Sequence, residues 1–180
     1  LLSRCATDLP TLNLHSPQIE PLHPTAMPHL VILYTPNLDL PADQGGTDMT
    51  ALCRALADSM LAQRDEATKP VFPCGGVRVL AYPAAHFAVS DGGAAGQAAG
   101  YSGVAGSYAF VYLNLRMGRG RSAAVHASVG AALEACAKAH FVTQLAQRPI
   151  GVTLQIDEGP EVFDAKNSSL HPLFSSPKLS

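Results

Sequence analysis

Pro28 is the residue of this sequence that could most directly act as a base. It follows Met27, the first methionine, at the start of an apolar run. A proline at a chain terminus is a secondary amine with an ordinary pKa of about 8, and nearby cations or removal from water lower that pKa toward neutrality. Inside a chain the same nitrogen is an amide without a usable lone pair. Pro28 could therefore be a base only if residues 1–27 are absent; otherwise it is a proline that enters a strand.

Two arginines could bind an anion near such a base. Arg78 lies between two valines in an apolar run, where a charge needs a partner or a cleft unless strand alternation turns it to solvent. Arg121 follows a Gly-Arg-Gly turn and precedes a helix start, so it is either a carboxylate ligand beside free backbone N–H groups or an exposed turn residue. Arg116 and Arg119 add positive charge nearby and are not counted as ligands.

The pattern of apolar residues predicts the elements that must position these side chains. Runs rich in β-branched residues predict strands at 29–35, 77–82, 108–116 and 150–156. Helical spacing predicts one helix from Thr47 or Asp48 to just before Lys69, and another from Ser122 to 145. Two βαβ units of this kind would form an α+β fold, a four-stranded mixed sheet with two helices on one face. The other face would expose apolar side chains, which favours an oligomer.

The remaining segments differ in composition. Residues 1–26 contain four prolines and no helical or strand period, so we expect a disordered leader or an upstream extension before a single domain over residues 27–180. Residues 91–107 are rich in Gly and Ala with almost no charge, which predicts a flexible surface loop. The tail from Gly159 holds three prolines and predicts irregular structure.

Composition excludes several classes of function. The 180 residues carry a formal net charge of −2, without the basic excess that a non-specific nucleic-acid binder needs. No apolar run approaches the roughly 20 residues of a membrane span, and residues 1–26 lack the pattern of a secretory signal. The four cysteines are far apart, which favours reduced thiols in a cytoplasmic protein. The seven histidines form no metal signature, and His140, on the apolar stripe of the second helix, is expected to be a hydrogen-bonded core residue.

Four blocks of sequence occur in order over nearly all of residues 27–174. They are Met27-Pro28-His29-Leu30; Phe72-Pro73 with Gly76-Val77-Arg78; Tyr108-Ala109-Phe110-Val111 running to Gly118-Arg119-Gly120-Arg121-Ser122; and Ile156-Asp157-Glu158 with Asn167 and His171-Pro172-Leu173-Phe174. Together they resemble the 5-carboxymethyl-2-hydroxymuconate isomerase family of the tautomerase superfamily. The sequence departs from that family in the longer loop at 91–107, in residues 1–26, and in Arg116 and Arg119, where a lysine and a small residue are familiar.

The resemblance implies a cofactor-free isomerase that moves a proton in 5-carboxymethyl-2-hydroxymuconate, in the catabolism of aromatic acids such as homoprotocatechuate. It implies Pro28 as the general base after removal of residues 1–27, and Arg78 and Arg121 as the groups that hold carboxylates and stabilise a dienolate. It also implies a homotrimer, with neither metal nor redox cofactor. Two other interpretations stay open. One is a tautomerase of another 2-hydroxydienoate or enol, with the long loop reshaping its site; the other is a non-catalytic oligomeric ligand-binding protein whose proline stays blocked.

Overall fold

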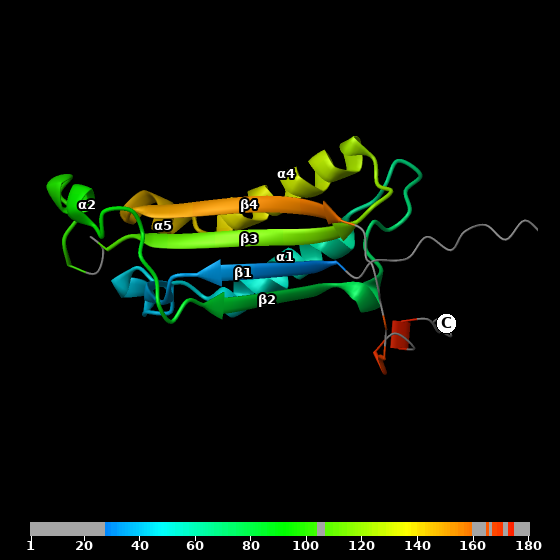
Figure 1. Cartoon of the computed structure of the whole chain (residues 1–180), viewed down its shortest axis with the longest axis horizontal. Helices are drawn as coiled ribbons and strands as arrows, with labels where there is room; N and C mark the ends of the chain where they lie inside the picture. The colour runs from blue at the N-terminus through cyan, green and yellow to red at the C-terminus, as the bar shows by residue number, and fades with distance from the viewer. Residues whose placement is uncertain (1–27, 104–106, 160–164, 166, 171–172, 175–180) are drawn as a thin grey trace, which may run out of the picture.

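β1 (His29–Tyr34) is a central strand of a mixed four-stranded sheet. It pairs in parallel with β2 (Arg78–Pro83) and antiparallel with β3 (Ala109–Gly118), and β3 pairs in parallel with β4 (Ile150–Gly159), so the order is β2-β1-β3-β4 (Figure 1). This computed structural model describes residues 28–103, 107–159, 165, 167–170 and 173–174. The mixed sheet that the sequence predicts is confirmed, whereas the predicted leader at 1–26 and most of the predicted irregular tail lie outside the described residues.

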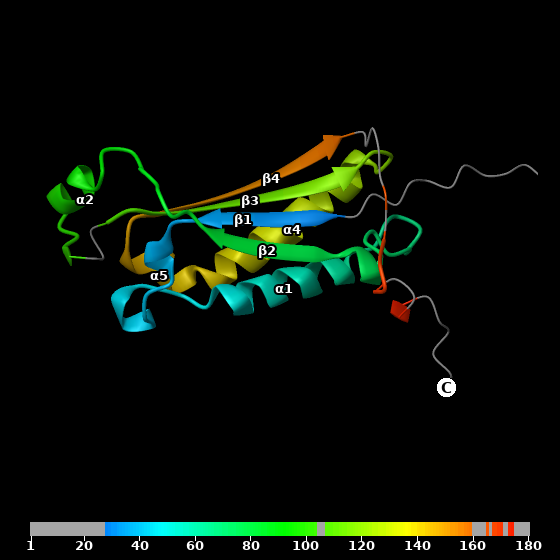
Figure 2. The same cartoon turned by 60° about the horizontal axis from the view of Figure 1, so that its bottom comes forward.

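Two helices, α1 (Met49–Ala62) and α4 (Ala123–His140), cover one face of this sheet (Figure 2). Each begins at a predicted N-cap: the Asp48 carboxylate accepts the N–H of Ala51 at 2.9 Å, and the Ser122 hydroxyl accepts that of Val125 at 3.2 Å. The two helices and the sheet bury a common apolar core, which includes Leu52, Leu56 and Met60 of α1, Val129 and Leu133 of α4, and Leu30, Ile32, Leu113 and Leu115 of the strands. No described helix is long and apolar enough to cross a membrane.

α1 ends at Ala62, several residues earlier than the sequence predicts. Gln63 is extended, and the chain then turns at Asp65, whose carboxylate accepts the backbone N–H groups of Ala67 and Lys69. The hydrogen bonds between the Asp65 side chain and the backbone therefore favour a turn, and α1 ends before the position that the spacing of apolar residues predicts. Three short 3-10 turns complete this part of the fold, and they are η1 (Pro36–Leu38), η2 (Ala42–Gln44) and η3 (Cys74–Gly76).

The second predicted helix is divided in two. α4 ends at His140, and after Phe141 the chain continues as α5 (Val142–Gln147). Phe141 is fully buried, but Leu145, which the sequence places on the apolar stripe, is 44% exposed. Nε2 of His140 lies 2.9 Å from the Thr47 hydroxyl, so the predicted hydrogen bond is present, but the residue is half-buried and does not belong to the core.

The other face of the sheet is not covered by any described element, and it is turned toward the viewer in Figure 1. We call it the open face. Four large apolar side chains on it, Leu33, Leu80, Tyr82 and Phe110, are between 36% and 49% exposed. A single copy of the chain therefore presents an apolar sheet face to solvent, as the two-layer pattern of the sequence predicts.

Residues 84–103 form an arm that extends beyond one end of the sheet (Figure 1). Its Gly- and Ala-rich part is predicted as a flexible loop, but it contains the short helix α2 (Ala94–Ala98). The Asp91 carboxylate accepts the backbone N–H groups of Gly93 and Ala95, and the Tyr108 hydroxyl accepts that of Gly96. Hydrogen bonds from the backbone N–H groups of α2 and its first turn to the side chains of Asp91 and Tyr108 thus hold this segment in place of an apolar core.

Candidate active site

Pro28 lies at the end of the sheet where β1 and β2 begin and β3 and β4 end. It is buried, and it packs against Gly76 of η3. A β-carbon at Gly76 would lie 3.5 Å from Cδ of Pro28 and only 2.8 Å from Cγ of Pro73. Cδ is bonded to the ring nitrogen, so the bare backbone of Gly76 leaves room beside the atom that would have to carry the proton.

Arg78, the first residue of β2, is brought beside Pro28 by strand register. Its partner in the parallel pair is His29, the residue that follows Pro28. The guanidinium turns back over the preceding loop, where Nη1 donates to the carbonyl oxygens of Gly75 and Val77, each at 2.9 Å. The side chain is half-buried, and its remaining N–H groups have no partner among the described residues. Arg78 thus lies on the face of β2 opposite to Val77 and Val79, as strand alternation predicts, while its guanidinium is tied to the preceding loop.

Arg121 is fixed at the same end of the sheet by the turn that leaves β3. Its Nη1 donates to the carbonyl of Gly118 at 2.9 Å and its Nη2 to that of Val71 at 3.1 Å, while the guanidinium lies 5.8 Å from the centre of the Phe72 ring. Burial lowers the pKa of this guanidinium, and the charge of Glu158 opposes that shift. Arginine remains charged at neutral pH even so.

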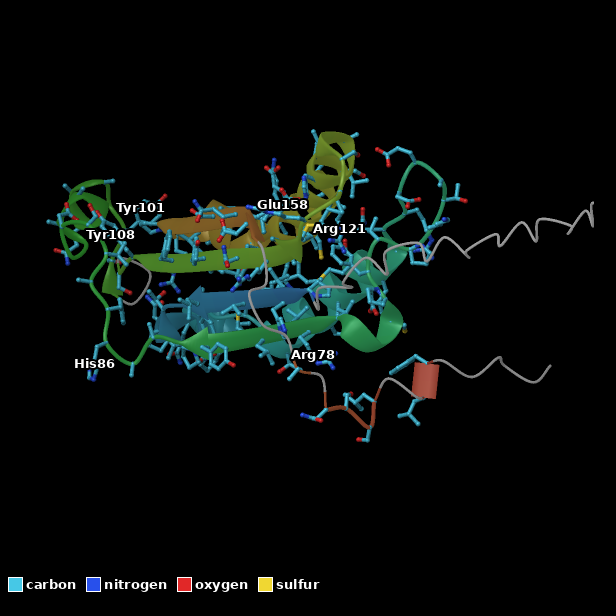
Figure 3. All side chains as sticks on the ribbon, turned by 45° about the vertical axis from the view of Figure 1, so that its right-hand side comes forward. Arg78, His86, Tyr101, Tyr108, Arg121 and Glu158 are labelled. Atoms are coloured by element: carbon cyan, nitrogen blue, oxygen red, sulfur yellow. The ribbon has the colours of Figure 1, made fainter. Side chains whose placement is uncertain are left out.

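One segment, residues 71–78, connects all three positions. Arg121 is bonded to Val71 and lies over Phe72, Pro28 packs on Gly76, and Arg78 ends the segment. Figure 3 shows the two arginines approaching the same end of the sheet from different elements. Pro28, Arg78 and Arg121, which are 50 and 43 positions apart in the sequence, thus lie at the same end of the sheet.

Neither arginine has a carboxylate oxygen within 4.0 Å among the described residues, although the charge of Glu158 acts on Arg121. The ion pair found there joins Arg54 to Asp58 at 2.7 Å, and Nε2 of His126 lies 4.0 Å from Glu158, with which it pairs only when the histidine is protonated. Arginines that are anchored through carbonyl oxygens and lack a carboxylate partner keep donors and charge for an external anion. The described residues contain no group of three or more side chains that could hold a metal ion.

Glu158 is a member of this end of the sheet that the sequence analysis did not select. Its Oε1 accepts the backbone N–H of Gly120 at 3.2 Å and faces the buried Nε2 of His126, which has no hydrogen-bond partner. The carboxylate thus fixes the turn that presents Arg121 and supports its charge. The contact joins β4 to the end of β3, so it depends on sheet register and is not visible in the spacing of the sequence.

A groove of about 270 Å³ lies at the opposite end of the open face. Its lining is largely apolar and includes Leu33, Phe87, Val89, Phe110 and Tyr112. A groove of this kind suits packing against an apolar surface, whereas a carboxylate substrate needs the unpaired cations at the Pro28 end.

The model of the 5-carboxymethyl-2-hydroxymuconate isomerase family matches residues 28–174. The chain belongs to this family. A solved structure of a 5-carboxymethyl-2-hydroxymuconate delta-isomerase is 53% identical, with a TM-score of 0.78, over 86% of this chain and 97% of that one. The corresponding isomerase from Deinococcus radiodurans R1 is 30% identical, with a TM-score of 0.65, over 86% of this chain and 99% of its own. A comparison with curated proteins gives no match. The chain is thus an isomerase of this family, as the four sequence blocks predict.

Proposed function

We propose that the chain isomerises 5-carboxymethyl-2-hydroxymuconate, with the nitrogen of Pro28 as the base once residues 1–27 are absent. One observation carries the proposal: the family match begins at Pro28, and this proline lies at the same end of the sheet as Arg78 and Arg121, neither of which has an ion pair among the described residues. The active species is then the processed chain, residues 28–180. The substrate is the one named by the family and by both solved relatives.

The reaction needs a proton carrier and fixed positive charge. The neutral proline nitrogen takes a proton from the 2-hydroxydienoate, the electron pair left behind spreads into a dienolate, and the protonated amine returns the proton to another carbon. Arg78 and Arg121 hold substrate carboxylates and stabilise the negative charge as it develops. Proline neither gains nor loses a proton overall, so no further reactant is required.

The surroundings of Pro28 suit a base that works near neutral pH. Burial disfavours the protonated amine, and so does the charge of Arg78 on the neighbouring strand. Both effects lower the pKa of a terminal amine from its ordinary value of about 8. The neutral form of the processed terminus is therefore available to accept a proton.

We also propose that the working assembly is a homotrimer held through the open face. Its exposed apolar side chains support this, because contiguous apolar surface on a soluble protein marks an interface. The arm gives a further reason: in one copy it lies at the opposite end of the sheet from Arg78, Arg121 and Glu158 (Figure 3). If the long arm adjusts substrate choice, it does so at the site of a neighbouring copy.

The decisive experiment measures the intact mass of the protein purified from its native host, together with turnover. We expect a mass that corresponds to the chain from Pro28 onward. Replacing Pro28 by Ala in the processed chain should lower kcat by at least about 100-fold, the lower range for a general base. A retained leader on a fully active protein would remove the base from the mechanism. A retained leader on an inactive protein would favour the ligand-binding alternative.

A tautomerase of a different enol remains the second candidate, because the arm is longer than the loop familiar in the family. Comparing kcat/KM for 5-carboxymethyl-2-hydroxymuconate, 2-hydroxymuconate and phenylpyruvate separates the two. We expect the first substrate to be preferred; a preference for phenylpyruvate would favour the second candidate.

A further inference from the structure

A row of four side chains crosses the open face next to Pro28. Strand register pairs His29 of β1 with Arg78 on one side and with Arg116 on the other, and it pairs Arg116 with Asp157 of β4. Residues paired in register point to the same face, and neighbouring strands lie about 4.8 Å apart. Arg78 and Arg116 are therefore two strand spacings apart, about 10 Å, with His29 between them on the same face of the sheet.

The Arg116 side chain extends toward the end of the sheet that holds the site. Its Nη2 lies 3.7 Å from the position that a β-carbon would take on Gly159, the last residue of β4. Gly159 pairs in register with Gly118, whose carbonyl holds Arg121. The guanidinium of Arg116 thus lies beside Gly159, and that of Arg121 is bonded to Gly118, the partner of Gly159 in the sheet. A larger residue at position 159 would occupy the space beside Arg116.

Arg116 is exposed and has no ion pair among the described residues. The nearest acidic residue by register is Asp157, but the Oδ2 of its carboxylate accepts a hydrogen bond from the side-chain amide of Asn114 at 2.8 Å. The next acidic residue along β4 is Glu158, which is engaged with Gly120 and His126. Among the described residues, Asp157 and Glu158, the acidic residues of β4 nearest to Arg116 in register, thus each have another polar partner.

We propose that Arg116 binds a third carboxylate of the substrate and so selects tricarboxylates over dicarboxylates. This deepens the proposed function and rests on it. 5-Carboxymethyl-2-hydroxymuconate carries three carboxylates, whereas Arg78 and Arg121 account for two. Arg116 supplies the remaining cation, and His29 lies between it and Arg78 as part of the surface on which the substrate rests.

The test compares Arg116→Gln in the processed chain with Arg119→Gln, which removes the same charge from an exposed position on the adjacent turn. The substrates are 5-carboxymethyl-2-hydroxymuconate and 2-hydroxymuconate, which lacks the carboxymethyl group. We expect Arg116→Gln to raise KM for the tricarboxylate by about tenfold to a hundredfold, the range for a charge-assisted hydrogen bond, and to leave KM for the dicarboxylate within about twofold. Arg119→Gln should change both values slightly and equally.

A loss of the same size with both substrates, no change with either, or a change of assembly mass in Arg116→Gln would overturn the proposal. The last outcome would place Arg116 in a contact between copies. Calorimetric binding of propane-1,2,3-tricarboxylate and glutarate gives a readout that does not need turnover. The wild type could isomerise neither substrate and still bind the tricarboxylate. If Arg116→Gln alone then loses that binding, the proposed function fails and the subsite stands.

Discussion

At the scale of single residues, Gly76 controls the space around Pro28. A β-carbon there would lie 2.8 Å from Cγ of Pro73, and neither proline ring can rotate away as a flexible side chain could. We expect Gly76→Ala to push Pro73 and the η3 turn aside, to disturb the packing of Pro28 through that turn, and to lower kcat of the processed chain by about tenfold or more, since small misplacement of a base is costly. The matched control is Gly130→Ala on α4, whose β-carbon would meet Ile156 at an ordinary 3.5 Å. Steady-state kinetics of the two variants decide this, and equal kcat values would contradict it.

The sequence analysis selected Pro28, Arg78 and Arg121 because their residue types suit acid–base and carboxylate chemistry. It missed Gly76, Glu158 and the anion-binding potential of Arg116 for one physical reason. Their contributions come from contacts across strands, and those contacts are set by register. A shift of one residue in the pairing of β3 would turn Arg116 to the buried face, so its role cannot be deduced from spacing along the chain.

At the scale of elements, the end of α4 links stability to pH through His140. Burial lowers the pKa of this histidine below its ordinary value of 6.5, although the charge of Asp48 opposes the shift. As the pH falls below 6.5, His140 becomes protonated in the unfolded chain while it is still neutral in the folded chain. The unfolded state therefore binds more protons, and the free energy of unfolding decreases as the pH falls. Above pH 6.5 both states are neutral at His140 and its contribution is fully present.

We therefore expect the free energy of unfolding to decrease as pH is lowered below about 6.5, and His140→Gln to reduce that slope. Glutamine can still reach the Thr47 hydroxyl but does not titrate. Urea unfolding at a series of pH values, for the wild type and the variant, measures the difference between the two slopes. Identical slopes would mean that His140 does not carry this linkage.

The sequence predicted the strands and the helix starts well because their signals are local. Alternating and β-branched residues mark the strands, while Asp48 and Ser122 mark the helix starts. The arm was predicted poorly because composition does not reveal where its caps come from. Tyr108, twelve residues beyond Gly96, supplies one of them, and Arg148 holds the carbonyl of Ser107 at 3.1 Å from beyond α5.

At the scale of the whole molecule, the two ends of the sheet have different chemistry. One end gathers Pro28 and the arginines, and the other carries the arm and the apolar groove (Figures 1 and 3). The open face runs between them and exposes Leu33 of β1 and Leu80 of the edge strand β2. An assembly through this face would cover the apolar surface and could bring the arm of one copy to the cationic end of another.

Charges introduced on the open face test that arrangement. We expect Leu33→Glu combined with Leu80→Glu to dissociate the proposed trimer, because each carboxylate buried at an interface without a partner costs on the order of several kcal/mol. The control is Val142→Glu on α5, which is 63% exposed and does not belong to the sheet. Light scattering should give the mass of one copy for the double variant and of three for the control, with unchanged circular dichroism in both. A double variant that keeps the trimer mass would place the interface elsewhere. A monomer that is folded but inactive, with Pro28 intact, would show that the site needs a neighbouring copy in addition to its own proline.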